Sequence, residues 1–273
     1  MDSLSGGGLA RSVLLFLVGI HRSVGRRRGP GNNAKLAGSR RTAVLFSGTT
    51  MIVVHHLNNS RSQRVLWLLE ELGLEYEIVR YQRDPKTMLA PPALRAIHPL
   101  GKSPVISDGD IVVAESGAIV EYLIETYGNG RLVPPAGTAE RRRWTYFLHY
   151  AEGSAMAPLL MKLIFDRVET SPAPFFVKPI ARAIAQKDKG SYIQPQIEMH
   201  LDYLEGELAK APWFAGAEFS AADIQMSFPL EAASARGGLD ASRPRLADFL
   251  QRIHGRPAFQ RALERGGPYE LLK

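Results

Sequence analysis

The stretch MIVVHHLNNSRSQRVLWLLEELGLEYEIVRY, residues 51–81, predicts a strand, a helix and a second strand in succession. Residues 52–57 are mostly apolar and lead into Asn-Asn-Ser, which is typical of a turn. Apolar residues then recur at three- and four-residue spacing over 65–72, and Gly73 ends this helical pattern. Residues 75–81 alternate between apolar and polar side chains, as a half-buried strand does.

The sequence that follows completes one α/β domain and then changes character. A short helix is expected near 93–97, a hairpin over 105–113 and a further helix over 115–127. The order β-α-β-α-β-β-α over residues 51–130 predicts a mixed four-stranded sheet covered by helices. A proline-containing linker is expected at 131–137, and 138–273 carries only helical patterns, which predicts an all-helical second domain.

Composition excludes several kinds of protein. The chain has 273 residues, no cysteine, 34 Lys and Arg and 27 Asp and Glu. Without cysteine there is no disulfide framework, no cysteine-ligated metal and no thiol nucleophile. The net charge of +7 lies within residues 1–50, so the remainder is neutral and no nucleic-acid surface is expected on it. No apolar run approaches the roughly 20 residues of a membrane-spanning helix.

The basic segment 1–50 is rich in Gly, Ser and Arg and is expected to be disordered. Three interpretations stand. It is an upstream extension ahead of a start at Met51, a targeting segment that resembles a mitochondrial transit peptide, or a functional tail. The expected location is therefore cytoplasmic, or mitochondrial if the segment is a transit peptide.

Ser60 stands between the first expected strand and the first expected helix. A hydroxyl there faces the amide groups and the partial positive charge of a helix N-terminus, a favourable place for an anion. Ser60 is thus a candidate hydrogen-bond donor to a bound thiolate. A plain helix cap is the alternative, and Ser62 competes for either role.

Polar residues at two further loops are candidates for holding a peptide-like ligand. A cis Ser103-Pro104 bond would expose the Ser103 backbone for pairing with such a ligand, whereas a trans turn proline is the alternative. Lys102 is either a point charge for a carboxylate or a solvated loop residue. Glu115 and Ser116 open a helix, where they suit the ammonium and carboxylate of an α-amino acid or simply form a helix cap.

Other chemistries find no support in the sequence. His55 and His56 are adjacent in a strand and point to opposite faces, so they cannot bind one metal ion, and no metal site is expected. There is no phosphate-binding loop, dinucleotide fingerprint or nucleophile elbow. Tyr146 and Tyr150 are candidates for lining an apolar substrate pocket, although aromatic residues at helical spacing also form cores.

Taken in order, four stretches resemble the glutathione transferase family, and the resemblance covers residues 51–273. They are HHLNNSRSQRVLWLLEELGLEYEI (55–78), IHPLGKSPVI (97–106), AESGAIVEYL (114–123) and FSAADIQMSFPL (219–230). The subgroup that they resemble most is a serine-type group of bacteria and fungi. The resemblance implies a thioredoxin-like domain followed by an all-helical domain, with glutathione as co-substrate and no metal.

The resemblance also implies roles for individual residues. Ser60 takes the place of the serine that stabilises the glutathione thiolate. Ser103 precedes the cis-proline of the family, Pro104, and pairs through its backbone with the cysteinyl part of glutathione. Glu115 and Ser116 hold the γ-glutamyl end, while Ser220 and Asp223 belong to a helix-capping motif.

Three departures limit the comparison with other classes of the family. Lys102 takes a position near the glycine carboxylate, but Gly101 stands where some classes have His or Gln. His55-His56 stands where tyrosine-type members have Tyr, and the absence of cysteine excludes the cysteine type.

The leading hypothesis is a glutathione transferase that acts on small hydrophobic electrophiles. A glutathione-dependent peroxidase and a non-catalytic module that binds glutathione or a protein are the alternatives. The resemblance also implies a homodimer.

Overall fold

Strand β1 is the inner element on which the first domain is built. It pairs in parallel with β2 and antiparallel with β3, and β4 completes the sheet order β2-β1-β3-β4. The computed structural model describes residues 51–87, 89–172 and 174–272, which fall within one unit. The basic segment 1–50, with its three interpretations, lies outside the described residues.

The elements follow the predicted order. The first domain contains β1 (Ile52–Leu57), α1 (Ser62–Leu72), β2 (Tyr76–Tyr81), α2 (Pro92–Ile97), β3 (Val105–Asp108), β4 (Ile111–Ala114) and α3 (Ser116–Tyr127). The second contains α4 (Ala139–Tyr150), α5 (Met156–Thr170), α6 (Lys178–Asp188), α7 (Gln194–Leu208), α8 (Ala221–Ala232), α9 (Pro244–His254) and α10 (Pro257–Gly266). The predicted fold class, a thioredoxin-like domain followed by a helical domain, is confirmed.

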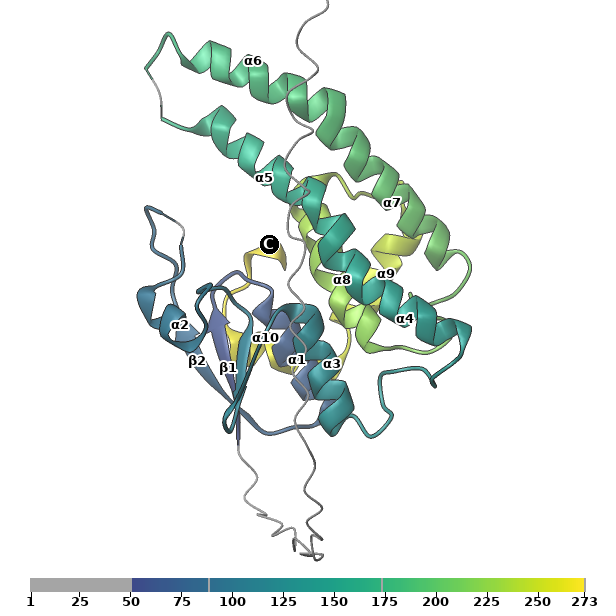
Figure 1. Cartoon of the computed structure of the whole chain (residues 1–273). Coiled ribbons are helices and arrows are strands. Elements are labelled where there is room, and N and C mark those ends of the chain that lie inside the picture. Colours follow the sequence, from purple (N-terminus) through teal and green to yellow (C-terminus); the bar gives the residue numbers. More distant parts are fainter. Residues whose placement is uncertain (1–50, 88, 173, 273) are drawn as a thin grey trace, which may run out of the picture. The chain divides into compact units, whose positions relative to one another are not determined.

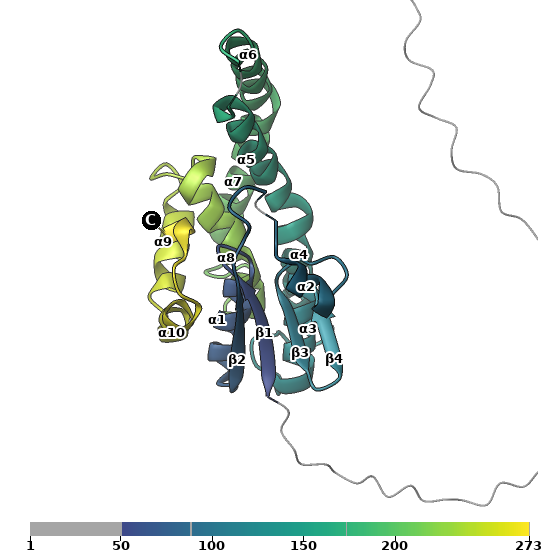
Figure 2. The same ribbon diagram turned by 90° about the vertical axis from the view of Figure 1, so that its left-hand side faces the viewer.

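In the second domain, two pairs of consecutive helices are each joined by a π-helical turn. Ala151–Ala155 connects α4 to α5, and Lys189–Ile193 connects α6 to α7. Figures 1 and 2 show α5 and α6 extending together beyond the rest of the domain. None of the helices in the described residues has the length and apolar composition needed to cross a membrane.

Helix α1 is buried on nearly all sides, because it lies between the sheet and the second domain (Figure 1). On its outer side it packs against α10, where Trp67 meets Phe259 edge to face with ring centroids 5.1 Å apart. Arg256 of the second domain donates to both carboxylate oxygens of Glu71, at 2.5 and 2.9 Å. The last long helix of the chain therefore covers the first.

The buried guanidinium of Arg64 joins four elements. Pro229 lies inside α8 and has no N–H, so the carbonyl of Gln225 one turn earlier lacks its helical donor. Nη1 of Arg64 donates to that carbonyl at 2.5 Å, and Nη2 donates to the Ser116 hydroxyl at 3.1 Å. Nη2 also pairs with Glu152 in the π-helical turn after α4. One side chain of α1 thus fixes α3, α8 and the α4–α5 junction.

The capping motif of α8 is present as expected. The Asp223 carboxylate accepts the backbone N–H groups of Phe214 and Ser220, both at 2.8 Å, and the Ser220 hydroxyl at 3.1 Å. Burial raises the pKa of Asp223 to about 6, against the effect of these hydrogen bonds. The motif fastens the loop before α8 to the first turn of the helix, so its role is structural.

The substitution Arg64→Met is expected to lower the free energy of unfolding by about 3–5 kcal/mol, because the Gln225 carbonyl loses its donor and the half-buried Glu152 loses one of its two arginine partners. Urea denaturation followed by circular dichroism measures the change. Pro229→Ala returns an N–H donor to the Gln225 carbonyl, so the double variant should recover about 1 kcal/mol. Equal losses in the single and double variants would contradict the role of the proline.

Candidate active site

Ser60 lies in the turn between β1 and α1 and is buried, with 5% of its surface exposed. Its Oγ accepts the backbone N–H of Ser62 at 3.3 Å and lies 2.7 Å from the Ser62 hydroxyl. The capping role considered from the sequence is therefore present in part. The bond from the Ser62 N–H does not use the Ser60 hydroxyl hydrogen, and the bond between the two hydroxyl groups can run in either direction.

Ser103 connects the loop before β3 to the end of β1, where the turn that carries Ser60 begins. Its hydroxyl donates to the His55 carbonyl at 3.0 Å and accepts the Leu57 N–H at 3.3 Å. Its Oγ lies 3.4 Å from the Oγ of Ser60, and the Ser103-Pro104 peptide bond is cis. The two predicted serines thus lie side by side at the end of β1.

A chain of hydroxyl groups leads from Ser60 into the protein. The Ser62 Oγ lies 2.9 Å from Nδ1 of His56, whose ring is buried. Burial, and then the charge of Arg80, lowers the pKa of His56 to about 4, so the imidazole is neutral near pH 7. The sequence did not single out this chain, because it depends on the side of β1 from which His56 projects.

The tautomer of His56 decides where the Ser60 hydrogen points. If Nδ1 carries the ring proton, it donates to Ser62, Ser62 donates to Ser60, and the Ser60 hydrogen remains for a third group. If Nδ1 carries no proton, Ser62 donates to Nδ1, and Ser60 donates to Ser62 instead. The first arrangement is the one that leaves Ser60 able to donate to an anion.

Glu115 and Ser116 stand at the start of α3, also as predicted. Glu115 has a positive φ of 73°, and Ser116 is buried. The guanidinium of Arg64 donates to the Ser116 hydroxyl at 3.1 Å and adds positive charge to that of the helix start. This end of the site therefore favours a carboxylate, and the sequence did not predict the contribution of Arg64.

Arg61 and Glu152 line the side of the site toward the second domain. Nε of Arg61 lies 2.8 Å from a Glu152 oxygen, and its guanidinium lies over the Phe228 ring at 5.3 Å. Burial alone would raise the pKa of Glu152, but Arg64 and Arg61 hold it below its ordinary value. Glu152 is therefore a carboxylate that balances part of the arginine charge.

The remaining predicted residues form no hydrogen bond with the serine pair in the described part of the chain. Lys102 is exposed to solvent on the loop that carries Ser103. Tyr146 stacks on Tyr150 with ring centroids 5.4 Å apart, and the Tyr150 hydroxyl lies 2.5 Å from Nδ1 of His200 on α7. The two tyrosines thus belong to the contact between α4 and α7, and their role in an electrophile pocket stays a prediction.

In the part of the chain that is described, no group of three or more His, Asp or Glu is placed to hold a metal ion. The expected division of the two histidines is observed, since His55 bonds Tyr81 and Ser107 across the sheet while His56 bonds Ser62.

Two family models match the chain, one in each domain. Residues 49–125 match the family model for the glutathione S-transferase N-terminal domain, and residues 166–252 match that for the C-terminal domain. Glutathione S-transferase 3 of Schizosaccharomyces pombe is 35% identical over 215 residues, covering 79% of this chain and 88% of that protein. The chain belongs to the glutathione S-transferase family.

Further relatives extend this match. Glutathione S-transferase 1 of Saccharomyces cerevisiae is 34% identical over 223 residues, covering 79% of this chain and 95% of the yeast protein. A solved glutathione S-transferase of Actinobacillus pleuropneumoniae has a TM-score of 0.67 at 31% identity, over 82% of this chain and 96% of that one. A sphingomonad glutathione S-transferase complexed with glutathione shares the fold, with a TM-score of 0.60 at 24% identity over 79% and 98% of the chains.

We predict that His56 makes this transferase less stable as the pH falls from 7 to 5. The unfolded chain binds a proton with a pKa of about 6.5, whereas folded His56 does so only near pH 4. The unfolded state therefore binds more protons in this window, and the loss amounts to about 2 kcal/mol. Urea denaturation at both pH values measures it.

His56→Gln should lose clearly less stability than the wild type between the two pH values. His149→Gln changes an exposed histidine on α4 and should retain the wild-type loss. If His56→Gln has the same pH dependence as the wild type, the buried imidazole is not the group responsible.

Proposed function

We propose that this enzyme conjugates the thiol of glutathione to small hydrophobic electrophiles and that Ser60 stabilises the thiolate. The observation that carries the proposal is the position of the Ser60 hydroxyl. It is buried at the start of α1 and lies 3.4 Å from Ser103, the residue expected to pair with the cysteinyl backbone of glutathione. The named relatives of the chain support glutathione as co-substrate.

The proposed chemistry depends on the thiol pKa. A free thiol has a pKa of about 8.5, so only a few per cent is thiolate at pH 7. A hydroxyl donor and the positive end of a helix favour the anion over the thiol, which lowers that pKa. Ser60 keeps its own proton and acts only as a donor.

In the conjugation step, the thiol proton leaves to solvent and the sulfur lone pair forms a bond to the electrophilic carbon. In a substitution, the bond to the leaving group breaks, and that group departs with the bonding electrons. In an addition, the electron pair of the double bond takes up a proton from water. Either route balances without a metal or a redox partner.

The remaining candidate residues determine the orientation in which glutathione would bind. The γ-glutamyl carboxylate would lie at Ser116, where Arg64 adds charge, and its ammonium would lie near Glu115. The Ser103 backbone would hold the cysteinyl part beside Pro104, and Lys102 would approach the glycine carboxylate. The sulfur then faces Ser60 and the second domain.

We predict that glutathione bound to the wild type titrates below the free-thiol pKa, and that in Ser60→Ala it titrates near it. Thiolate absorbance in the ultraviolet, followed against pH with bound glutathione, measures this directly. At pH 6.5 the kcat/KM for 1-chloro-2,4-dinitrobenzene should fall tenfold or more in the variant, because one lost charge-assisted hydrogen bond is worth about 1.5–3 kcal/mol.

Ser62→Ala is the matched control, because it removes the neighbouring hydroxyl and keeps Ser60. If Ser62→Ala lowers kcat/KM and raises the thiol pKa as much as Ser60→Ala does, Ser60 alone does not account for the stabilisation, because Ser62 is also bonded to Ser60. Glutathione binding without a lowered thiol pKa or turnover would favour the non-catalytic binding module. Turnover with a hydroperoxide but not with an electrophile would favour the peroxidase.

We also propose that the enzyme is a homodimer. Exposed apolar side chains on the outer strand β4 and on α4 and α7 support it: Ile111, Val112, Tyr146, Met199 and Tyr203. Light scattering after size exclusion should give twice the chain mass of 30.1 kDa. Val112→Glu should shift the protein toward one chain mass, and a wild type at one chain mass would contradict the proposal.

A further inference from the structure

The helical hairpin of α5 and α6 extends beyond the rest of the second domain in both views of Figures 1 and 2. We call residues 156–172 and 174–193, which include both helices and the π-helical turn after α6, the arm. The loop at its tip carries Phe175 and Phe176, whose side chains are 86% and 64% exposed. Their rings meet edge to face with centroids 5.5 Å apart. Two large apolar side chains thus lie together in solvent at the end of the arm.

Exposed apolar side chains continue from this loop along α6. Val177 precedes the helix, and Ile180 and Ile184 lie one turn apart on the same face of it. All three are exposed, whereas Ala185 on another face of the helix is buried. We call the two phenylalanines together with these three residues the tip surface. No part of the described chain covers it, and an exposed apolar surface of this kind indicates a site of interaction.

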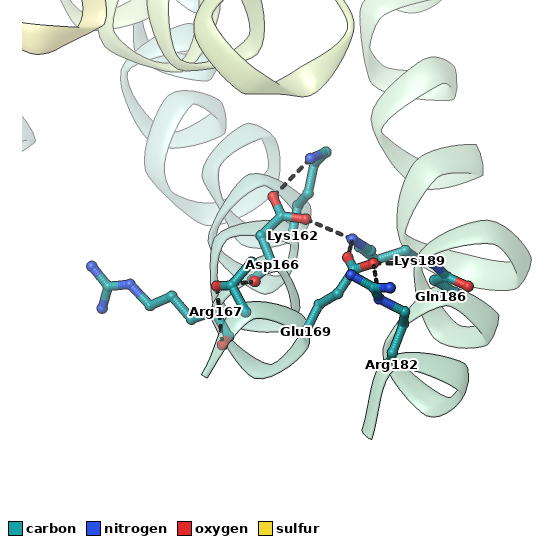
Figure 3. A network of polar contacts seen from close by, with 8 residues as sticks. Lys162, Asp166, Arg167, Glu169, Arg182, Gln186 and Lys189 are labelled. Carbon is teal, nitrogen blue, oxygen red and sulfur yellow. Dashed lines mark hydrogen bonds and ion pairs between the residues drawn. The ribbon is translucent and has the colours of Figure 1, made fainter. Parts of the chain in front are cut away.

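Ion pairs hold α6 against α5. Asp166 binds Lys162 and Lys189, both at 2.8 Å, and Glu169 also binds Lys189. Arg182 of α6 lies 3.6 Å from Glu169. Figure 3 shows this network between the two helices. The network fixes which side of α6 meets α5, so the helix cannot turn to bury its exposed apolar face there.

The arm is positively charged, although the chain after residue 50 is neutral as a whole. It has six Lys and Arg and three Asp and Glu, a net charge of +3. Lys178 at the start of α6 and Lys187 near its end are exposed and have no ion-pair partner among the described residues. In Figure 3 the side chain of Arg167 points away from the network. Basic side chains therefore accompany the tip surface along α6.

This combination of side chains is typical of a protein surface that lies at a membrane interface. Aromatic side chains enter the boundary between head groups and acyl chains, while Lys and Arg bind anionic head groups. A second copy of the chain suits the tip surface less well, because two arms of net charge +3 would repel each other. The dimer surface proposed above lies on β4, α4 and α7 and includes no residue of the tip surface.

We propose that the tip surface binds the surface of membranes that contain anionic lipids. Phe175 and Phe176 enter the head-group layer, and the exposed apolar face of α6 lies along it. Lys178 and Lys187 approach the lipid phosphates. The arm lies in the membrane surface in this arrangement and does not span the bilayer. The inference does not depend on the proposed transferase function.

Sedimentation of the full chain with lipid vesicles tests the proposal. Vesicles of equal parts phosphatidylserine and phosphatidylcholine should bind the protein more tightly than vesicles of phosphatidylcholine alone. The double variant Phe175→Ser, Phe176→Ser should bind the anionic vesicles about tenfold more weakly or worse, because two aromatic rings no longer leave water. Lys178→Gln and Lys187→Gln should each weaken binding about fivefold, the effect of one basic residue near a lipid surface.

Leu100→Ser and Lys86→Gln are the controls, because they remove a similarly exposed apolar side chain and an exposed lysine from the first domain. Both should bind vesicles as the wild type does. The basic segment 1–50 is present in every variant, so binding by that segment would leave the tip variants equal to the wild type. That equality, or a wild type that does not bind anionic vesicles, would overturn the proposal.

Phe175→Trp reports insertion of the tip directly. Lipids brominated in their acyl chains should quench the fluorescence of this variant more than that of Leu100→Trp. Vesicle binding without such quenching would overturn the insertion of the tip. Light scattering tests the second copy as the occupant. If the double phenylalanine variant falls from two chain masses to one, and the wild type does not sediment with vesicles, the tip surface belongs to a contact between copies and the proposal is overturned.

Discussion

The buried guanidinium of Arg64 is the interaction on which the arrangement of the two domains depends. It supplies the donor that Pro229 cannot give to α8, and it binds Ser116 at the start of α3 and Glu152 between α4 and α5. A buried charge is tolerated only where its partners surround it, so each of these elements must sit in one position. The second domain is thereby held against the face of the first that carries the candidate site.

This arrangement also explains the charge of the site. Positive charge comes from the helix starts at α1 and α3 and from the guanidinium groups of Arg61 and Arg64, and Glu152 of the second domain compensates part of it. The neutral His56 adds no charge of its own, and the tautomer of its ring decides whether the Ser60 hydroxyl hydrogen is used within the protein or remains for a ligand. The positive charge therefore attracts the anionic parts of a ligand. The uncharged side chains of His56 and Ser62 influence the direction in which the Ser60 hydroxyl donates its hydrogen.

The sequence predicts the fold closely because its signals are local. Alternation and helical spacing locate the strands and helices, and Ser60 and Ser103 meet because both follow or precede strands that pair in the sheet. The partners of Arg64 are beyond such reasoning, since Glu152 lies 88 positions away and Gln225 lies 161 positions away. The sequence contained one signal of this contact. Pro229 lies inside a helical pattern, which indicates that the carbonyl four residues earlier needs a donor from elsewhere.

Tyr146 and Tyr150 show that a helical pattern does not identify the partner of a helix face. Helical spacing places Tyr146 and Tyr150 on one side of α4 but does not say which neighbour that side meets, and it meets α7.

The contact between α1 and α10 has a consequence for the order of events during synthesis. The outer face of α1 exposes Trp67 and Glu71 until Phe259 and Arg256 reach them, more than 180 residues later. The ribosome has by then made almost the whole chain, so the first domain emerges with an apolar surface that it cannot cover by itself. Loss of the last 20 residues would leave the earliest helix in the state of an unfinished nascent chain.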